Sequence, residues 1–271
     1  DQPRSRGLGD VYKRQAKDAG ILPMMTYAKD GGTSFVFQAL MANNSSAEDV
    51  QNWILQKSGT FDNQAAQDAA STLQDWNNKG YMPEGVNAVD ASTALSRFCN
   101  GEGLFFPSGN WNLDTVAKAL GDDVQFFAFP GATSEDEPNV AANAGAFYGI
   151  PVNAKNRDAA AAFLDYTQSA EAQQIIVDNS GYLPKSSTLD LKANSALQQS
   201  MFDAYADVLT SGHTSDFINN ATAGMQSSGL IPNFQLLLDN SITPQEFTKN
   251  VQAQYDLSLI HISEPTRPRL I

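Results

Sequence analysis

The sequence predicts an α/β fold in which helices cover both faces of short sheets. Short apolar runs of strand length occur at 21–27, 104–106 and 124–129, and between them lie segments with apolar residues at helical spacing. Strands that alternate with helices are typical of this class. At 271 residues, 42% of them hydrophobic, the chain can bury a substantial core in one or two domains.

The overall charge restricts the kinds of partner. The formal net charge is −13, so an electrostatic footprint for nucleic acid or anionic lipid is missing, and partners are expected to be neutral or cationic. The single cysteine, Cys99, excludes an internal disulfide and is read as a small hydrophobic residue beside a helix end. No apolar run approaches the roughly 20 residues of a membrane span.

Both ends of the chain look foreign to the rest. Residues 1–15 contain four basic side chains, residues 257–271 contain Arg267 and Arg269, and both segments resemble translated sequencing-adaptor reads within an otherwise acidic chain. We therefore expect the fold to occupy residues 16–256. We also expect the chain to be a fragment that lost its amino-terminal portion, together with any export signal.

The first elements follow from periodicity and turn residues. Residues 21–27 are an apolar run introduced by Gly20 and followed by KDGG, which predicts a buried strand that ends in a tight turn. The spacing of apolar residues within 33–44 predicts a helix. A second helix is expected after Asp62 as its cap, with Gly80 as its stop. The residues expected to be buried on these two helices are Phe35, Val36, Ala39 and Leu40, and Ala69, Leu73 and Trp76.

The middle of the chain continues this alternation. A short helix is expected at 91–98, and a strand at 104–106 that Pro107 closes. The next helix begins at Asn110 or Asn112 and ends at Leu120, with Leu113, Val116, Ala117 and Leu120 buried. Residues 124–129 are almost continuously apolar, which predicts a strand covered on both faces.

The remaining elements are mostly helical. The acidic loop 132–139 is expected to be a solvated turn, and 140–151 an extended segment. Two helices follow, the first with a stripe of Phe163, Tyr166 and Ala170, the second capped by Ser169. Thr243, Pro244 and Glu246 form a capping box for a last helix that ends near Asp256. Its buried stripe is Phe247, Val251 and Tyr255.

Residues typical of catalysis are scarce. The histidines are His213 and His261, the second in the foreign-looking tail, which removes most His-dependent triads and zinc sites. No nucleophile elbow, P-loop, dinucleotide-binding glycine motif or CxxC occurs. The carboxylates show no paired spacing that separates a glycosidase dyad from surface acids. The sequence therefore predicts a protein that is not an enzyme, with no cofactor and no metal.

Trp111 is the best candidate for a ligand contact. It follows a Gly-Asn turn at the start of a helix, where unpaired backbone N–H groups can donate to ligand oxygens. A pyranose has an apolar face that stacks on an indole and a rim of hydroxyls that need hydrogen-bond partners. Asn110, Trp111 and Asn112 are therefore a chemically sensible set. The same spacing fits a tryptophan that only plugs the junction between strand and helix.

Three further aromatic residues admit two interpretations. Phe147 and Tyr148 follow a glycine and either line a cleft or belong to the core, as aromatic residues of an apolar strand commonly do. Tyr182 is open to the same two interpretations.

Taken in order, several segments resemble the carboxy-terminal part of an extracellular solute-binding protein of the sugar-binding class, the maltose-binding-protein-like receptors of ABC importers. The resemblance covers roughly residues 16–256, and the order and spacing of its segments are more specific than any one motif. The segments are ILPMMTYAKDGG, DNQAAQDAASTLQDWNNKGY, FCNGEGLFFPSGNW, VQFFAFPG, AGAFYGIPVNAKNRDAAAAFLDYTQSAEAQ, GYLP and SITPQEFTKNVQAQYD.

This resemblance implies a type II periplasmic-binding-protein-like fold of two α/β lobes with a ligand cleft between them. Residues 16–128 and 186–256 would form the carboxy-terminal lobe. Residues 129–185 would return to the amino-terminal lobe, which would be incomplete.

The resemblance also implies which residues meet the ligand. Trp111 would stack on sugar, with Asn110 and Asn112 beside it. The other expected cleft residues are Asp30, Phe35, Gly145, Phe147 and Tyr148. The family often supplies another aromatic residue from the late helical region, where this chain has AGMQSSG with Met225 and Ser227.

The function implied is that of a monomeric receptor that binds a small-molecule carbohydrate, closes its lobes and delivers the ligand to the ABC permease subunits in the membrane. It would be periplasmic or a cell-surface lipoprotein. Two alternatives stay open: a binding protein for another solute, such as a polyamine or a peptide, and a glycoside-acting enzyme on a similar scaffold. Acidic residues in the cleft would favour a cation, and aromatic residues with amides a sugar.

Overall fold

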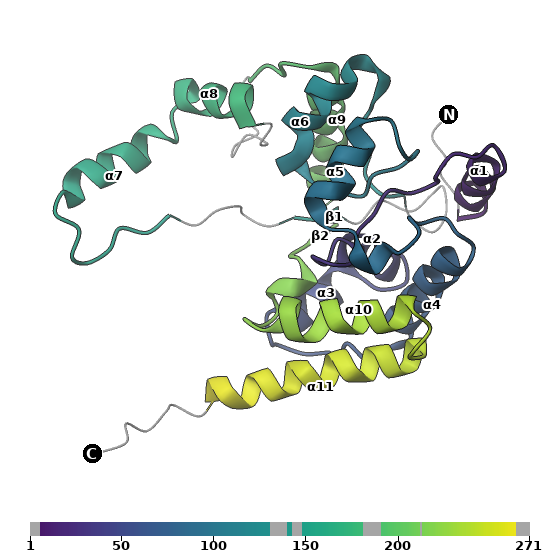
Figure 1. Ribbon diagram of the computed structural model, residues 1–271. Helices are drawn as coiled ribbons and strands as arrows, with labels where there is room; N and C mark the ends of the chain where they lie inside the picture. Colours follow the sequence, from purple (N-terminus) through teal and green to yellow (C-terminus); the bar gives the residue numbers. More distant parts are fainter. Residues whose placement is uncertain (1–5, 131–139, 143–147, 181–190, 212, 264–271) are drawn as a thin grey trace. The chain divides into compact units, whose positions relative to one another are not determined.

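The computed structural model describes residues 6–130, 140–142, 148–180, 191–211 and 213–263 (Figure 1). The chain divides into two compact units. Unit 1 comprises residues 1–107, 129–143 and 211–271, and unit 2 comprises residues 108–128 and 144–210. The predicted lobe boundaries lie elsewhere along the chain and stay a prediction about the family fold. Within the described residues, no helix is both long and apolar enough to cross a membrane.

Unit 1 is mainly helical, and most of its predicted elements are confirmed. The helix expected at 33–44 spans 33–42, and the one expected at 91–98 spans 91–99. Its elements are α1 (Arg6–Asp18), α2 (Thr33–Ala42), α3 (Ala47–Ile54), α4 (Gln64–Asn78), α5 (Ala91–Cys99), β1 (Val140–Ala141), β2 (Thr214–Ser215), a π-helix (Met225–Leu230), α10 (Ile231–Leu238) and α11 (Pro244–Ser263).

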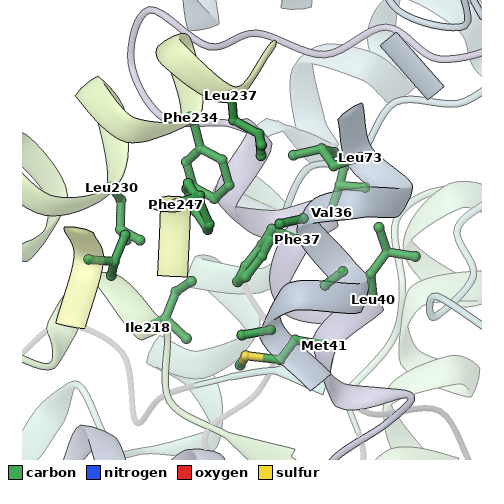
Figure 2. Packing of buried hydrophobic residues seen from close by; sticks show 14 of the residues in the cluster. Val36, Phe37, Leu40, Met41, Leu73, Ile218, Leu230, Phe234, Leu237 and Phe247 are labelled. Carbon is green, nitrogen blue, oxygen red and sulfur yellow. The ribbon is translucent and has the colours of Figure 1, made fainter. Parts of the chain in front are cut away.

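The core of unit 1 is an aromatic cluster around Phe37 on α2. Its ring centroid lies 5.6 Å from that of Phe61 and 5.3 Å from those of Phe234 and Phe247. Figure 2 shows Phe37, Phe234 and Phe247 converging with aliphatic side chains from α2, α4 and residues 218–237. Because α2, α4, α10 and α11 all meet here, the cluster joins segments that are far apart in the sequence.

The predicted burial pattern of α2 is confirmed in part. Val36 and Leu40 are 1% exposed, as expected, whereas Phe35 and Ala39 are only half-buried. Phe37 lies outside the predicted stripe and is fully buried. The stripe was incomplete because α2 buries eight of its ten residues and so has no single core face.

The strand pairings in the described residues are short. Residues 22–25 run parallel to 104–105: the N–H of Leu104 donates to the Leu22 carbonyl (2.9 Å), and the N–H of Met25 donates to the Phe105 carbonyl (2.8 Å). β1 and β2 form a two-stranded parallel sheet in which Val140 faces Thr214. Neither of the predicted strands 21–27 and 104–106 forms in the described residues, where the two segments share one isolated bridge between Met24 and Phe105.

Helix caps follow the sequence closely, with one correction. The capping box of α11 is confirmed: Thr243 Oγ1 accepts from the N–H of Glu246 (3.2 Å), and Glu246 Oε2 accepts from the N–H of Thr243 (2.8 Å). Asp62 was the wrong cap for α4. Asn63 caps it, because the Asn63 Oδ1 accepts the N–H of Ala66 at 2.9 Å, while an Asp62 oxygen accepts from Thr248.

The two ends of the chain both extend helices. α11 continues beyond Asp256 to Ser263, so its predicted end was wrong. No glycine or proline occurs between 257 and 264 to stop it. In α1, the Lys13 Nζ lies 3.3 Å from the centroid of the Trp76 ring, over a core tryptophan that is 4% exposed. The adaptor-like origin of residues 1–15 and 257–271 stays a prediction.

Unit 2 is built from four helices in its described residues: α6 (Leu113–Leu120), α7 (Arg157–Tyr166), α8 (Ala170–Ser180) and α9 (Ala196–Ser211). Gln198 is fully buried, and both ends of its amide are used: its Nε2 donates to the Val177 carbonyl (2.9 Å) and its Oε1 accepts from the N–H of Asn194 (2.7 Å). The buried apolar residues are Leu113, Val116, Ala172, Val177, Leu197, Met201 and Val208.

One prediction at the boundary of unit 2 was wrong, and the predicted burial on α6 is confirmed in part. Residues 124–129 form no strand, because a strand needs a ladder partner, and the N–H of Phe126 donates instead to Ser200 Oγ (2.9 Å). The stripe on α7 is not buried: Phe163 is 64% and Tyr166 45% exposed. On α6, Leu113 and Val116 are buried as expected, but Ala117 and Leu120 are only half-buried.

Parts of three predicted segments lie outside the described residues. They are the acidic loop 132–139, residues 143–147 with Gly145 and Phe147, and the GYLP segment with Tyr182.

The cap of α5 predicts a specific acid sensitivity. Asp90 accepts hydrogen bonds from the side chain and the N–H of Thr93 and from the hydroxyl of Ser92, and these hold the pKa of its carboxyl well below its ordinary value of 3.8. Because the folded-state pKa is depressed, the stability that the charge contributes is present above about pH 4 and is lost as the pH falls through the depressed pKa.

Replacing Asp90 by asparagine keeps a cap but removes the titrating group. We expect wild type to have the higher Tm at about pH 7, and the difference between the two proteins to shrink toward about pH 2. Thermal unfolding over this range measures it. A difference in Tm between the two proteins that stays constant with pH would contradict this coupling between the protonation of Asp90 and stability.

Candidate functional site

The turn at residues 108–112 in unit 2 holds the predicted ligand-contacting residues. Gly109 is extended (φ −131°, ψ 179°), and the chain then makes a single 3₁₀ turn over Asn110–Asn112. The N–H of Asn112 donates to the Gly109 carbonyl (3.2 Å), and its Nδ2 donates to Ser108 Oγ (2.9 Å). The Asn112 side chain therefore fixes the turn, and its Oδ1 is the acceptor that it presents.

Trp111 differs from the other two tryptophans of the chain in exposure. Its side chain is 40% exposed, whereas Trp53 and Trp76 are each 4% exposed and belong to the core of unit 1. Trp76 was expected in the core, and this is confirmed. The exposed indole favours the platform interpretation over a buried plug, although its role as a ligand contact stays a prediction.

A glycine makes room for the indole. A Cβ atom at Gly109 would lie 2.2 Å from Cζ3 and 2.3 Å from Cη2 of Trp111, far closer than carbon atoms can approach. The six-membered ring of the indole therefore lies directly on the backbone of Gly109. Sequence reasoning identified the glycine as part of a turn and missed its second role, which is to support the ring.

The helix that follows anchors this turn. Leu113 and Val116 are buried on α6, at 5% and 6% exposure, which fixes the first turn of the helix on unit 2. The side chain of Asn112, the N-cap residue of α6, makes no capping hydrogen bond to a described residue of the helix. The N–H of Leu113 donates to the Asn110 carbonyl, and the use of the next backbone donors of α6 by a ligand stays a prediction.

The fit between Gly109 and the indole gives a testable prediction. In Gly109→Ala the added methyl must displace the ring of Trp111, so we expect the acrylamide quenching of Trp111 emission to change. We also expect carbohydrate affinity to fall by about tenfold, roughly half of the binding free energy that one good aromatic contact contributes. Gly149→Ala is the matched control in the same unit, because a Cβ there meets no atom within 4 Å. Equal quenching in wild type and both variants would show that the ring does not rest on Gly109.

Tyr148 is described and is 67% exposed, so it does not belong to a core. Its neighbours in the predicted set, Gly145 and Phe147, lie outside the described residues. The cleft interpretation of this segment therefore stays a prediction.

In unit 1, Asp30 and Phe35 both have structural partners. The Asp30 Oδ2 accepts the N–H of Ala91 at 2.8 Å and so helps to fix the amino end of α5. Phe35 is half-buried, and its ring packs edge-on against that of Phe217, with centroids 5.9 Å apart. Asp30 also lies near enough to the buried Tyr27 to add to the burial that raises the pKa of that phenol. The carboxylate of Asp30 itself is exposed.

Gln226 is a neighbour of Asp30 that sequence reasoning missed. It lies on the π-helix, and its Nε2 donates to the Asp30 carbonyl at 3.1 Å, while its Oε1 is buried without a partner. Gly31, with φ +86°, makes this possible, because a Cβ there would lie 2.1 Å from the Gln226 Nε2. The consecutive glycines after the first strand were the one available signal.

The structure thus places the predicted residues in two groups. Asn110, Trp111 and Asn112 share one turn of unit 2, and Asp30 and Phe35 lie in unit 1 with Gln226. Unit 1 also has a hollow of about 480 Å³ that none of the predicted residues lines; it lies beside the ends of α4 and α10, where Asn77, Glu84, Asn87 and Asp239 line it. Cys99 is half-buried, and burial raises the pKa of its thiol.

Comparison with known proteins gives one family and a consistent fold. The model of the family described as bacterial extracellular solute-binding protein matches residues 8–202, which are 195 of the 271 residues. A search of curated proteins gave no match.

Several solved structures share the fold at low sequence identity. One described as a chitin oligosaccharide binding protein has 19% identity and a TM-score of 0.79, covering 97% of this chain and 66% of its own. One from work on xylan utilization by the thermophilic bacterium Caldanaerobius polysaccharolyticus has 18% identity and a TM-score of 0.75, covering 94% and 66%. A bacterial solute receptor with a preference for β-D-galactopyranose has 18% identity and a TM-score of 0.75, covering 95% and 66%. The chain thus spans 66% of the length of these structures.

Proposed function

Because this chain belongs to the bacterial extracellular solute-binding protein family, we propose that it is part of a receptor that binds a sugar or an oligosaccharide. The fold of the chain is that of type II periplasmic-binding-protein-like sugar binders. The family and the similar structures are binding proteins, which agrees with the scarcity of catalytic residues in the sequence.

The exposed indole of Trp111 is the observation that carries the carbohydrate proposal. A flat apolar surface with amide side chains on either side matches a pyranose, which has an apolar face and a polar rim. Asn112 retains its Oδ1 as an acceptor, because its Nδ2 donates to Ser108. A polyamine would in addition need carboxylates to balance its charge, and none of Asn110, Trp111 and Asn112 supplies one.

The similar structures support the same ligand class. Their descriptions name a chitin oligosaccharide, xylan and β-D-galactopyranose, and these share the pyranose ring although they differ in length and substituents. This chain spans 66% of those structures. The identity of its sugar and the affinity of the isolated chain are therefore both proposals. We propose weak binding by the chain alone, because part of the wall of the cleft is contributed by the remainder of the fold.

The mechanism we propose is closure around the solute. In a two-lobed receptor, a ligand held by one lobe stabilises the closed state by contacting the other, so the difference in affinity between open and closed states drives the hinge. The closed form then docks on the membrane subunits of an ABC importer and releases the sugar to them. We further propose that the receptor acts as a monomer, either free in the periplasm or as a cell-surface lipoprotein.

A ligand panel on the protein with its adjoining reading frame restored tests this proposal. Thermal unfolding is measured with chito-, xylo- and galacto-oligosaccharides, with a polyamine and a peptide as the alternatives. We expect at least one carbohydrate at saturating concentration to raise the Tm by about 2 °C or more. A shift with the polyamine or the peptide alone would overturn the carbohydrate proposal, and hydrolysis of the glycosides during incubation would indicate an enzyme instead.

A further inference from the structure

The paired strands β1 and β2 of unit 1 flank one long segment of unit 2. Unit 2 resumes at residue 144, shortly after β1, and it ends at residue 210, shortly before β2. Because β1 and β2 pair with each other, the segment 144–210 is attached to unit 1 through a single strand pair. The position of this pair on unit 1 therefore constrains both ends of the segment.

The β1–β2 pair is too short to hold its own position. Each strand has two residues. The N–H of Val140 donates to the His213 carbonyl (3.1 Å), and the N–H of Ala142 donates to the Ser215 carbonyl (2.9 Å). A two-stranded ribbon on its own is marginally stable in water even when its strands are longer. Other contacts within unit 1 must therefore fix the pair.

The buried side chain of Gln38 on α2 supplies such contacts. It is 3% exposed. Its Nε2 donates to Ser215 Oγ (3.1 Å) and to the Asp216 carbonyl (2.7 Å), and its Oε1 accepts the N–H of Ile218 (3.0 Å). Gln51 on α3 adds a further bond, because its Oε1 accepts the N–H of Asp216 at 2.7 Å. A fully bonded buried amide favours one arrangement of its partners, since other arrangements leave buried polar groups unpaired.

We infer that Gln38 is a positioning residue for solute binding, which fixes the β1–β2 pair on unit 1 while its own buried amide stays out of reach of the solute. The inference rests on the proposed function, in which the receptor closes around a sugar. The apparent affinity of a receptor falls with the fraction of molecules that are competent to bind. Loss of the Gln38 amide releases the strand pair and lowers this fraction, so the apparent Kd rises although every ligand contact is kept.

Gln38→Met tests the inference, because methionine fills similar space without the hydrogen bonds. Gln74→Met is the matched control. Gln74 is a glutamine of α4 in the same unit, and its Nε2 also donates to the carbonyls of a distant segment, those of Leu237 (2.8 Å) and Ile242 (3.3 Å). Both variants lose a glutamine that joins distant parts of unit 1, but only Gln38 holds the strand pair.

Two measurements are made on each variant. Hydrogen exchange of the Val140 and Ala142 amides in the 271-residue chain reports the strand pair, because Gln38 bonds to neither amide. The amide of Met25, which donates to the Phe105 carbonyl elsewhere in unit 1, corrects for a general loss of stability. Calorimetric titration of the restored protein with the best carbohydrate of the panel gives the Kd.

In Gln38→Met we expect the Val140 and Ala142 amides to exchange at least about tenfold faster relative to Met25, and the Kd to rise about tenfold. In Gln74→Met we expect both quantities to stay within about twofold of wild type, although its Tm also falls. Gln51→Met removes one bond to the same segment and should change both quantities in the same direction. It decides the question if Gln38→Met does not fold.

Three outcomes would overturn the inference: unchanged exchange of the strand pair in Gln38→Met, faster exchange with an unchanged Kd, or an equal rise of the Kd in Gln74→Met. Failure of the proposed function has a different signature. Wild type then binds no sugar of the panel, while hydrogen exchange still shows whether Gln38 holds the strand pair.

Discussion

Replacing Phe37 by alanine is expected to destabilise unit 1 by about 3 to 5 kcal/mol, the usual cost of removing a fully buried aromatic ring. The side chain has no exposed surface, and its ring contacts those of Phe61, Phe234 and Phe247 at centroid distances of 5.3 to 5.6 Å. These partners come from three separate parts of the chain. The cavity cannot collapse easily, because Phe234 and Phe247 are held on α10 and α11 and the ring of Phe61 packs on that of Trp53.

Denaturant unfolding followed by the emission of Trp53 and Trp76 measures this loss, since both tryptophans belong to the same core. Phe37→Leu should cost clearly less, because leucine refills most of the space. Phe163→Ala in the 271-residue chain is the matched control: its ring is 64% exposed, so the change should be within about 0.5 kcal/mol. Equal effects of Phe37→Ala and Phe163→Ala would contradict the assignment of the core.

Replacing Trp111 by alanine is expected to weaken carbohydrate binding by about 30-fold, equivalent to about 2 kcal/mol, and to leave the free energy of unfolding nearly unchanged. The two effects separate because the indole is 40% exposed and rests on a glycine instead of filling a core. Trp111→Phe should retain part of the affinity, since a smaller flat ring remains.

Calorimetric titration of the restored protein with the best carbohydrate of the panel gives the affinity of each variant. Phe127→Ala is the control, because Phe127 lies in the same unit with a similar exposed fraction, 37%, and is not a predicted contact. An affinity unchanged in Trp111→Ala, or reduced equally in Phe127→Ala, would remove the basis for the indole platform.

Local patterns in the sequence predicted local structure well. The helices α2, α4, α5 and α11 were identified from periodicity, and the capping box of α11 forms because each of its hydrogen bonds joins residues three apart. Ser169 likewise accepts the N–H of Ala172, as expected of the cap of α8. Such contacts depend on a few neighbouring residues, and so the sequence contains all that is needed to find them.

The errors concern contacts with distant segments. Residues 124–129 have the composition of a buried strand, but whether a strand forms depends on a partner elsewhere in the chain. The stripe on α7 was identified as apolar, and whether it is buried depends in the same way on contacts with distant segments. Asp62 and Asn63 are both good caps, and only the side-chain geometry, with Thr248 near Asp62, selects between them.

In the candidate site, too, the local feature was predicted and the contacts that depend on side-chain geometry or distant residues were not. Trp111 was found from its turn, and its exposure agrees with the expected role. Gly109 as the support of the ring and Gln226 as the partner of Asp30 were not foreseen. The first depends on a rotamer of Trp111. The second joins residues 196 apart in the sequence, and its one signal in the sequence is the pair of consecutive glycines at positions 31 and 32.

Acrylamide quenching of tryptophan emission, with and without bound oligosaccharide, tests the central claim most directly. Trp53 and Trp76 are buried, so the quenchable emission of the chain comes mainly from Trp111. If the indole is the platform for the sugar, saturating oligosaccharide lowers the quenching of the restored protein to that of its Trp111→Phe variant. Saturation with the sugar that leaves the quenching of wild type unchanged would contradict the account.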